Sequence, residues 1–159
     1  MNWWKQFKPK ACSVNLKAAS KDAALVELIE NLVKAGVLEE SLQEPATQAL
    51  RDREELATTG LGMGVAIPHV KCPGLMKTAV AISVHKDGID WSALDGESVH
   101  VLVTVLRPEE GGPEHDPADH LEMMGWLAKL ARESDFRRFA RGARTKTDLV
   151  DLLKEMSSV

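Results

Sequence analysis

The sequence predicts a single α/β domain in which a sheet is covered by helices. A length of 159 residues fits one domain with one hydrophobic core. Apolar residues recur at helical spacing in the first third, form short β-branched runs in the middle and return to helical spacing in the last third. This order of helices, strands and helices is typical of one α/β domain.

Two helices are expected before the first strand. The first runs over 22–37, where one stripe is apolar, with Ser20 as its N-cap and Gly36 at its end. The second runs over 41–56 and tolerates Pro45 because the proline falls in its first turn.

The residue pattern in the middle of the chain predicts turns and strands. The run 58–64 is a glycine-punctuated turn that leads into a short apolar strand at 65–67. The segments 79–84 and 99–106 are apolar and β-branched enough to be buried strands. Between them, the Asp-Gly pairs at 87 and 95 flank a brief extended piece at 89–91.

The last third begins with the expected surface loop 109–119, which holds two glycines, two prolines and five acidic residues. A helix is expected over 120–132, with Leu121, Met124, Leu127, Ala128 and Ala131 on one face. We expect Ser134 to cap a short helix through Phe136 and Phe139, and Thr147 to cap a final helix.

The composition narrows the function classes. A hydrophobic share of 44% and a mixed charged share of 28% are ordinary for a globular protein, and a net charge of -4 argues against a nucleic-acid binder. No apolar run approaches the roughly 18 to 20 residues of a membrane span. Cys12 and Cys72 allow at most one disulfide, and reduced thiols in a cytoplasmic protein are the simpler interpretation.

Four features could carry chemistry: Arg53, the glycine turn, His69 after a strand and a proline, and His120 at the start of a helix. A neutral imidazole with a restrained backbone is a well-aimed nucleophile. Glycines let main-chain N–H groups approach an anion closely, and an arginine offers a planar fork to phosphoryl oxygens.

Each feature alone has an ordinary structural explanation. The glycine turn lacks both the Lys-Ser/Thr of a P-loop and the GxGxxG spacing, so it fits a tight turn before a strand. His69 could be a hydrogen-bonded core histidine, and Arg53 could belong to a solvated helix face. His115, Asp116, Asp119 and His120 could suggest a metal cluster but fit a solvated loop better. We expect His85 to lie at the surface.

The continuous run REELATTGLGMGVAIPH at 53–69 favours a functional role for these residues over a structural one. It resembles the signature of the mannitol/fructose-type IIA domains of the bacterial phosphotransferase system (PTS), a family that includes the nitrogen-regulatory IIA proteins. Later pieces agree in order: GIDW at 88–91, LDGESV at 94–99 and DHL at 119–121. The resemblance extends over about 17–156.

The resemblance implies a mixed sheet of about five strands flanked by helices. It implies that His69 accepts a phosphoryl group, supported by His120 and Arg53, with Thr59, Gly60, Gly62 and Gly64 binding the phosphate and with no cofactor or metal. It divides the chain into an N-terminal arm or first short strand at 1–16, the IIA domain at 17–156 and a tail at 157–159.

The implied partners are an HPr-like phosphocarrier as donor and a IIB domain or regulated proteins as acceptors, with no nucleic acid and no integral membrane segment. We expect the domain to act without a fused IIB or IIC segment, and a regulatory binding module of the nitrogen-PTS type is therefore the main alternative. A metal-dependent hydrolase built on His69, His115 and His120 is a weaker one. The resemblance leaves open which sugar is involved, if any, and what the long loop 108–119 does.

A docking surface is expected around the acceptor. Leu61, Met63, Leu75 and Met76 flank the glycine turn and the segment after His69. We expect these side chains to form its apolar centre, with the acidic loop 109–119 at the rim. The alternative is that they pack down onto the sheet.

Overall fold

The computed structural model describes residues 2–109 and 116–159, and it contains one mixed, five-stranded sheet. The strands are β1 (Gly60–Gly62), β2 (Val65–Ala66), β3 (His69–Cys72), β4 (Ala79–Ile89) and β5 (Val99–Pro108). β5 lies in the middle, antiparallel to β4 on one side and parallel to β2 and β3 on the other. The fold class predicted from the sequence is confirmed.

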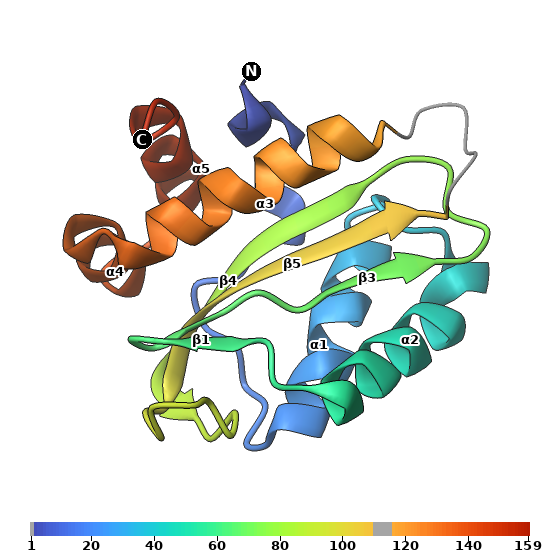
Figure 1. The fold of residues 1–159 in the computed structure, drawn as a ribbon, viewed down its shortest axis with the longest axis horizontal. Helices are drawn as coiled ribbons and strands as arrows, with labels where there is room; N and C mark the ends of the chain where they lie inside the picture. Colours follow the sequence, from blue (N-terminus) through green and yellow to red (C-terminus); the bar gives the residue numbers. More distant parts are fainter. Residues whose placement is uncertain (1, 110–115) are drawn as a thin grey trace.

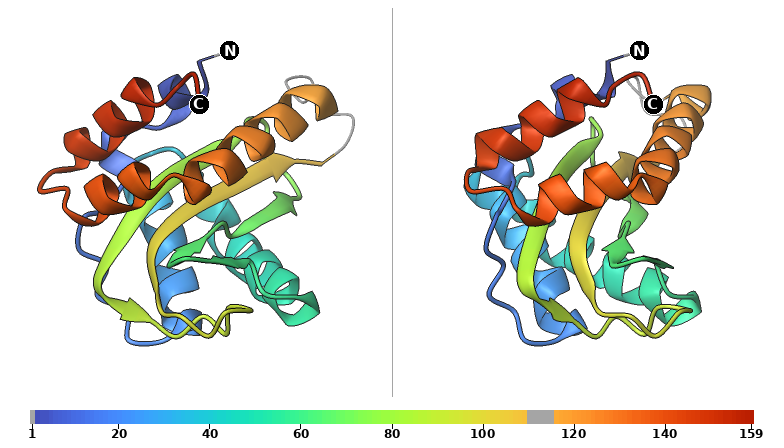
Figure 2. Two further views of the ribbon diagram at one scale, coloured as in Figure 1. Left: turned by 60° about the vertical axis from the view of Figure 1, so that its left-hand side comes forward. Right: turned by 90° about the vertical axis from the view of Figure 1, so that its left-hand side faces the viewer.

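Helices cover both faces of this sheet (Figures 1 and 2). α1 (Lys21–Lys34) and α2 (Gln43–Leu56) pack on one face, with the short turn η3 (Glu40–Leu42) before α2. α3 (Pro117–Arg132), α4 (Ser134–Arg141) and α5 (Lys146–Glu155) lie on the other. Burial on both faces explains why β4 and β5 read as apolar runs rather than as alternating strands.

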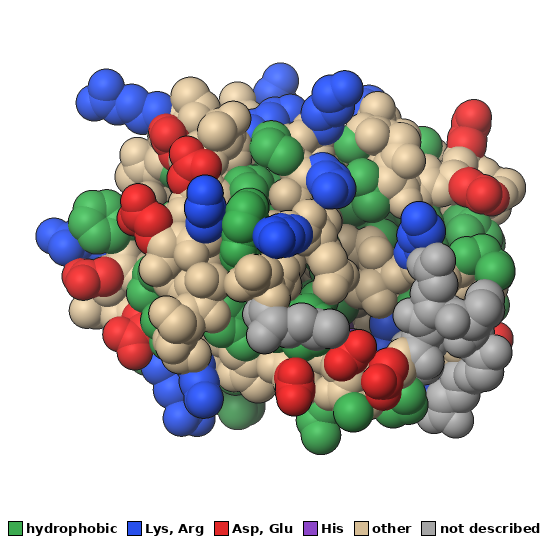
Figure 3. Space-filling view, turned by 90° about the horizontal axis from the view of Figure 1, so that it is seen from above, with side chains coloured by type: hydrophobic (Ala, Val, Ile, Leu, Met, Phe, Trp, Pro, Cys, Tyr) green, Lys and Arg blue, Asp and Glu red, His purple; other side chains and the backbone are tan. Residues whose placement is uncertain are grey.

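The N-terminal arm joins the second helical layer through two 3₁₀ turns, η1 (Trp3–Gln6) and η2 (Pro9–Ala11). Trp3 and Phe7 are buried, and the Phe7 ring meets the Trp126 ring edge-on with 6.4 Å between centroids. Aromatic side chains therefore hold the arm on the domain. On this face, Lys and Arg side chains spread over the middle, and most acidic side chains lie toward the edges (Figure 3).

The helix starts in the last third differ from those predicted. α3 begins at Pro117, so residues 117–119 are helical rather than loop, and Asp116 caps it by accepting a hydrogen bond from the Ala118 N–H at 2.9 Å. Ser134 lies inside α4 and caps nothing. α5 begins two residues early because Thr145 and Asp148 form a reciprocal capping box, which binds two free N–H groups at once.

The predictions for the other helices are confirmed with small shifts. Ser20 caps α1 by accepting a hydrogen bond from the Ala23 N–H at 3.2 Å, and Gly36 follows the helix with a φ of +74°. Pro45 lies in the first turn of α2. Both cysteines are buried and unpaired. In the described ranges, no helix is long and apolar enough to span a membrane.

Candidate functional site

His69 lies at the point where one edge of the sheet is interrupted. β2 and β3 both run beside β5, and Pro68 separates them because a proline cannot donate a ladder hydrogen bond. The backbone at the break is nevertheless fixed. The Ile67 N–H donates to the Thr59 carbonyl at 3.0 Å, and the Val105 N–H donates to the Pro68 carbonyl at 2.9 Å. The imidazole is therefore held by a rigid backbone and stays partly exposed.

One ring nitrogen of His69 is already engaged. Nδ1 lies 2.7 Å from the Ile67 carbonyl oxygen. Because a carbonyl only accepts hydrogen bonds, the proton of the neutral ring must be on Nδ1. The lone pair is then on Nε2, and this nitrogen is the nucleophile that the site presents.

Burial and the nearby arginines favour the neutral form of His69. Burial is the largest cause that lowers the pKa of His69 below its usual 6.5, and the guanidinium groups of Arg53 and Arg107 lower it further. The hydrogen bond to the Ile67 carbonyl and the Glu54 carboxylate oppose this shift. A ring that stays neutral near pH 7 keeps its Nε2 lone pair available for attack.

The two arginines reach this region from different elements. Arg53, in the last turn of α2, donates from Nη1 to the Ala57 carbonyl at 2.8 Å, which holds its head at the C-terminal end of the helix. Arg107 was not among the residues singled out from the sequence. Register reveals it: His69 pairs with Val105 in parallel strands, so Arg107, two residues further on, projects from the same face as His69.

The lowered pKa of His69 makes a prediction about stability. The unfolded chain binds the proton of this ring more readily than the folded chain does. The free energy of unfolding therefore decreases as the pH falls below 6.5. We expect wild-type protein to lose more stability between pH 7 and pH 5 than His69→Gln, as measured by urea unfolding. Equal losses in the two proteins would show that the ring titrates alike in both states.

The glycine turn has a strained backbone that is fixed by a hydrogen bond to another segment of the chain. Gly62 and Gly64 have positive φ, and so does Met63 at +59°. The Met63 N–H donates to Asp95 Oδ2 at 2.8 Å, and a Cβ added at Gly62 would lie 2.9 Å from the same oxygen. Glycine at 62 is therefore required by the close approach of the Asp95 carboxylate.

The start of this turn has internal hydrogen-bond partners. The Thr59 N–H donates to Glu54 Oε2 at 3.2 Å, and its hydroxyl lies between Glu54 Oε1 and the indole N–H of Trp91. The Gly60 N–H donates to the Thr58 hydroxyl at 3.1 Å. Phosphate binding by Thr59, Gly60, Gly62 and Gly64 stays a prediction, and at Thr59 and Gly60 it requires these bonds to be shared or exchanged.

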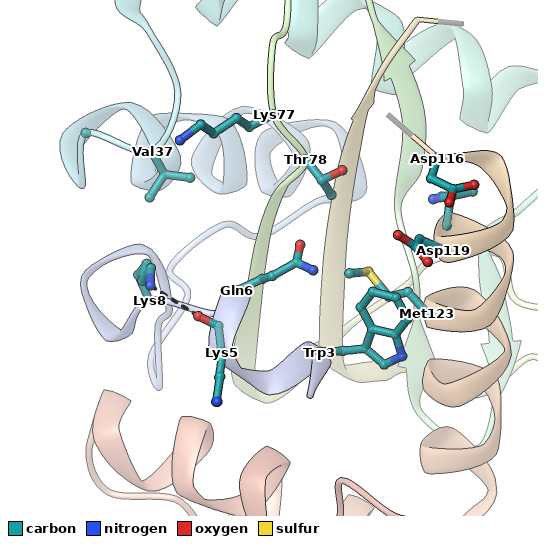
Figure 4. Close-up of a pocket in the computed structure, with 12 residues that line it drawn as sticks. Trp3, Lys5, Gln6, Lys8, Val37, Lys77, Thr78, Asp116, Asp119 and Met123 are labelled. Carbon is teal, nitrogen blue, oxygen red and sulfur yellow. Dashed lines mark hydrogen bonds between the residues drawn. The ribbon is translucent and has the colours of Figure 1, made fainter. Parts of the chain in front are cut away.

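His120 occupies a different setting. It lines an open cavity of about 560 Å³ between the N-terminal arm, the residues that precede β4 and the first turn of α3. In Figure 4, Asp116 and Asp119 stand on the α3 side, Lys77 on the opposite side, and Trp3 and Met123 below. His69 and Arg53 are not among the residues that line it, so support of His69 by His120 stays a prediction.

The metal-site alternative depends partly on a residue outside the described ranges. His115 lies in the segment 110–115. Among residues 2–109 and 116–159, no three His, Cys, Asp or Glu side chains are grouped so that they could hold a metal ion.

Comparison with known proteins gives a consistent family signal. Residues 5–156 match the family model of the phosphoenolpyruvate-dependent sugar phosphotransferase system, EIIA 2. The fructose-specific EIIA component of the PTS from Haloferax volcanii is 33% identical over 138 residues, which are 87% of this chain and 85% of that protein. A nitrogen regulatory protein from Bradyrhizobium diazoefficiens is 34% identical over 145 residues, covering 91% and 90%.

Solved structures share the fold. The nitrogen regulatory protein IIA-Ntr from Neisseria meningitidis superposes with a TM-score of 0.79 at 24% identity, covering 94% of this chain and 97% of that one. Enzyme IIA for mannitol from Escherichia coli, solved in complex with phosphorylated enzyme IIB, gives a TM-score of 0.70 at 20% identity, covering 94% and 97%.

Proposed function

Because the chain belongs to the EIIA 2 family of the phosphoenolpyruvate-dependent sugar phosphotransferase system, we propose that it is a phosphocarrier whose acceptor atom is Nε2 of His69. The observation that carries this proposal is the 2.7 Å contact between Nδ1 and the Ile67 carbonyl, which leaves the lone pair on Nε2. The site thus offers a neutral nucleophile near two guanidinium groups.

The chemistry needs little beyond position and charge. The Nε2 lone pair forms a new N–P bond while the N–P bond of a donor phosphohistidine breaks, and the leaving electron pair returns to the donor ring. The proton of His69 stays on Nδ1 throughout, where it is donated in a hydrogen bond to the Ile67 carbonyl. Arg53 and Arg107 offset charge on the phosphoryl oxygens, which is the main requirement of phosphoryl transfer.

The proposed donor is an HPr-like phosphocarrier, and its transfer is directly measurable. Incubating the protein with enzyme I, HPr and phosphoenolpyruvate should add one phosphate per chain, seen as a single mass increase that is stable in base and lost in acid. If this relay and its nitrogen-type counterpart both leave the mass unchanged, the chain is not a phosphocarrier.

Two relatives support two uses of the phosphoryl group. Similarity to a fructose-specific EIIA component supports onward transfer to a cysteine of a IIB domain in the cytoplasm. Similarity to a nitrogen regulatory protein supports a switch, in which the phosphorylation state of His69 decides which protein is bound. Phosphorylated protein mixed with a candidate IIB domain decides between them: loss of label to IIB indicates transport, and retention with altered binding of a regulated partner indicates a switch.

The surface beside the site fits a transient protein contact. Leu61 is 47% exposed, Met63 46% and Met76 59%, whereas Leu75 is partly buried against the core. Leu94, which is not in the docking set expected from the sequence, is 93% exposed in the segment that contacts the glycine turn through Asp95. A brief contact between two carriers is expected to bury less than about 1,200 Å² around such an apolar centre.

We expect an NMR titration of His69→Ala protein with the HPr-like donor to shift Leu61, Met63, Met76 and Leu94 most. The alanine variant prevents phosphorylation, so every shift reports binding. Phe139 is the internal control because its ring is also exposed but belongs to α4, in the layer on the other face of the sheet. Shifts that cluster at Phe139 and spare the four residues would place the docking surface elsewhere.

A further inference from the structure

A partly buried ion pair lies beside the start of the glycine turn, to which Glu54 is hydrogen-bonded through Thr59. Lys21, at the start of α1, brings its ammonium to 2.6 Å from Glu54 Oε2, and the side chains are only 24% and 6% exposed. The same ammonium donates to the Trp91 carbonyl at 3.1 Å and lies 5.3 Å from the centre of the Trp91 ring. Removing two charges from water costs free energy, and short contacts and further hydrogen bonds are needed to offset this cost.

This pair is linked to the turn through Thr59. Glu54 accepts from the N–H and the hydroxyl of Thr59, and the buried Trp91 donates its indole N–H to the same hydroxyl at 3.1 Å. Lys21 thereby connects α1, α2, the glycine turn and the segment after β4, which come together at one end of the molecule (Figure 1).

The position of Glu54 creates an electrostatic problem for an anion. Glu54 follows Arg53 in α2, and its carboxylate is close enough to raise the pKa of His69 while Arg53 lowers it. An unpaired carboxylate there would repel an incoming phosphoryl group and draw the arginine away from it. Lys21 offsets that charge through its 2.6 Å contact with Glu54 Oε2.

We propose that Lys21 is a positioning residue for His69. Its ammonium neutralises Glu54 and holds this carboxylate on Thr59, so the turn keeps its shape and the phosphoryl group meets Arg53 and Arg107 without a competing anion. Lys21 acts through Glu54, since its ammonium is taken up by Glu54 and Trp91. This inference rests on the proposed function for its kinetic effect but not for its effect on the His69 ring.

The experiment compares Lys21→Met, Lys21→Arg, Glu54→Gln and the double variant Lys21→Met/Glu54→Gln. We expect Lys21→Met to lower kcat for phosphoryl acceptance at least about tenfold, with a smaller change in KM, because one charge-neutralising group is removed. The double variant should recover most of kcat because the uncompensated anion is gone, and Lys21→Arg should retain it. Lys34→Met, at the other end of α1 and exposed, is the matched control.

An NMR titration of the His69 ring separates this inference from the proposed function. In Lys21→Met the pKa of His69 should rise toward its usual value, and in the double variant it should fall back toward the wild-type value. Both results are expected whether or not any donor phosphorylates the protein. A melting temperature that falls while kcat and the His69 titration match wild type would reduce Lys21 to a structural residue and overturn the inference. If Lys21→Met fails to fold, the double variant is compared with Glu54→Gln. A kcat of the double variant well below that of Glu54→Gln would also overturn the inference.

Discussion

Replacing His69 by alanine is expected to abolish phosphorylation by the enzyme I and HPr relay. Nε2 of His69 is the proposed nucleophile because Nδ1 is hydrogen-bonded to the Ile67 carbonyl at 2.7 Å. Arg53 and Arg107 cannot take its place, since their guanidinium groups are cations without a free lone pair. Intact-mass spectrometry should show one added phosphate on wild type and none on His69→Ala.

The matched control for this experiment is His100→Gln. His100 is another partly buried histidine, whose Nδ1 lies 3.1 Å from the His85 carbonyl on the β4 side of β5. It should accept phosphate at the wild-type level. Phosphate that persists on His69→Ala, mapped to any other residue, would remove the acceptor assignment while leaving the family membership intact.

The second large effect is expected at the two arginines. Removing one group that stabilises developing charge costs on the order of 10² to 10³ in rate. We expect Arg53→Ala and Arg107→Ala each to lower kcat for phosphoryl acceptance by this order, and Arg53→Lys to recover part of the loss. His120→Ala should still accept one phosphate, but more slowly.

Arg51→Ala is the control for a general loss of positive charge on α2. Arg51 lies two residues from Arg53, but its guanidinium is bound to Asp22 at 2.7 Å and is absent from the groups that shift the pKa of His69. Rapid-quench measurement of a single turnover gives the rates. Rates within a factor of about two of wild type in both Arg53→Ala and Arg107→Ala would contradict the electrostatic role assigned here.

Tertiary packing explains where sequence reasoning about single residues failed. His85 was expected at the surface beside Lys86, yet it is 8% exposed. Its Nε2 lies 2.7 Å from the Ala18 carbonyl, and its Nδ1 accepts from the Gly88 N–H at 3.0 Å, so it fastens a bulge in β4. A partner 67 residues away leaves no local signal. The error at Thr147 has a local cause instead: Thr145, not Thr147, has a partner three residues on, Asp148, with which it forms the capping box.

The sequence by itself determined the fold class, the main helices and strands, and the family. Each of these follows from local pattern: apolar spacing, caps and a continuous motif at 53–69. Tertiary structure decided which side chains act on His69. Arg107 comes from a strand 38 positions later in the chain, and Lys21 acts from α1 through Glu54. Strand register and burial bring these charges together, and the residue spacing within a single segment predicts neither the register nor the burial.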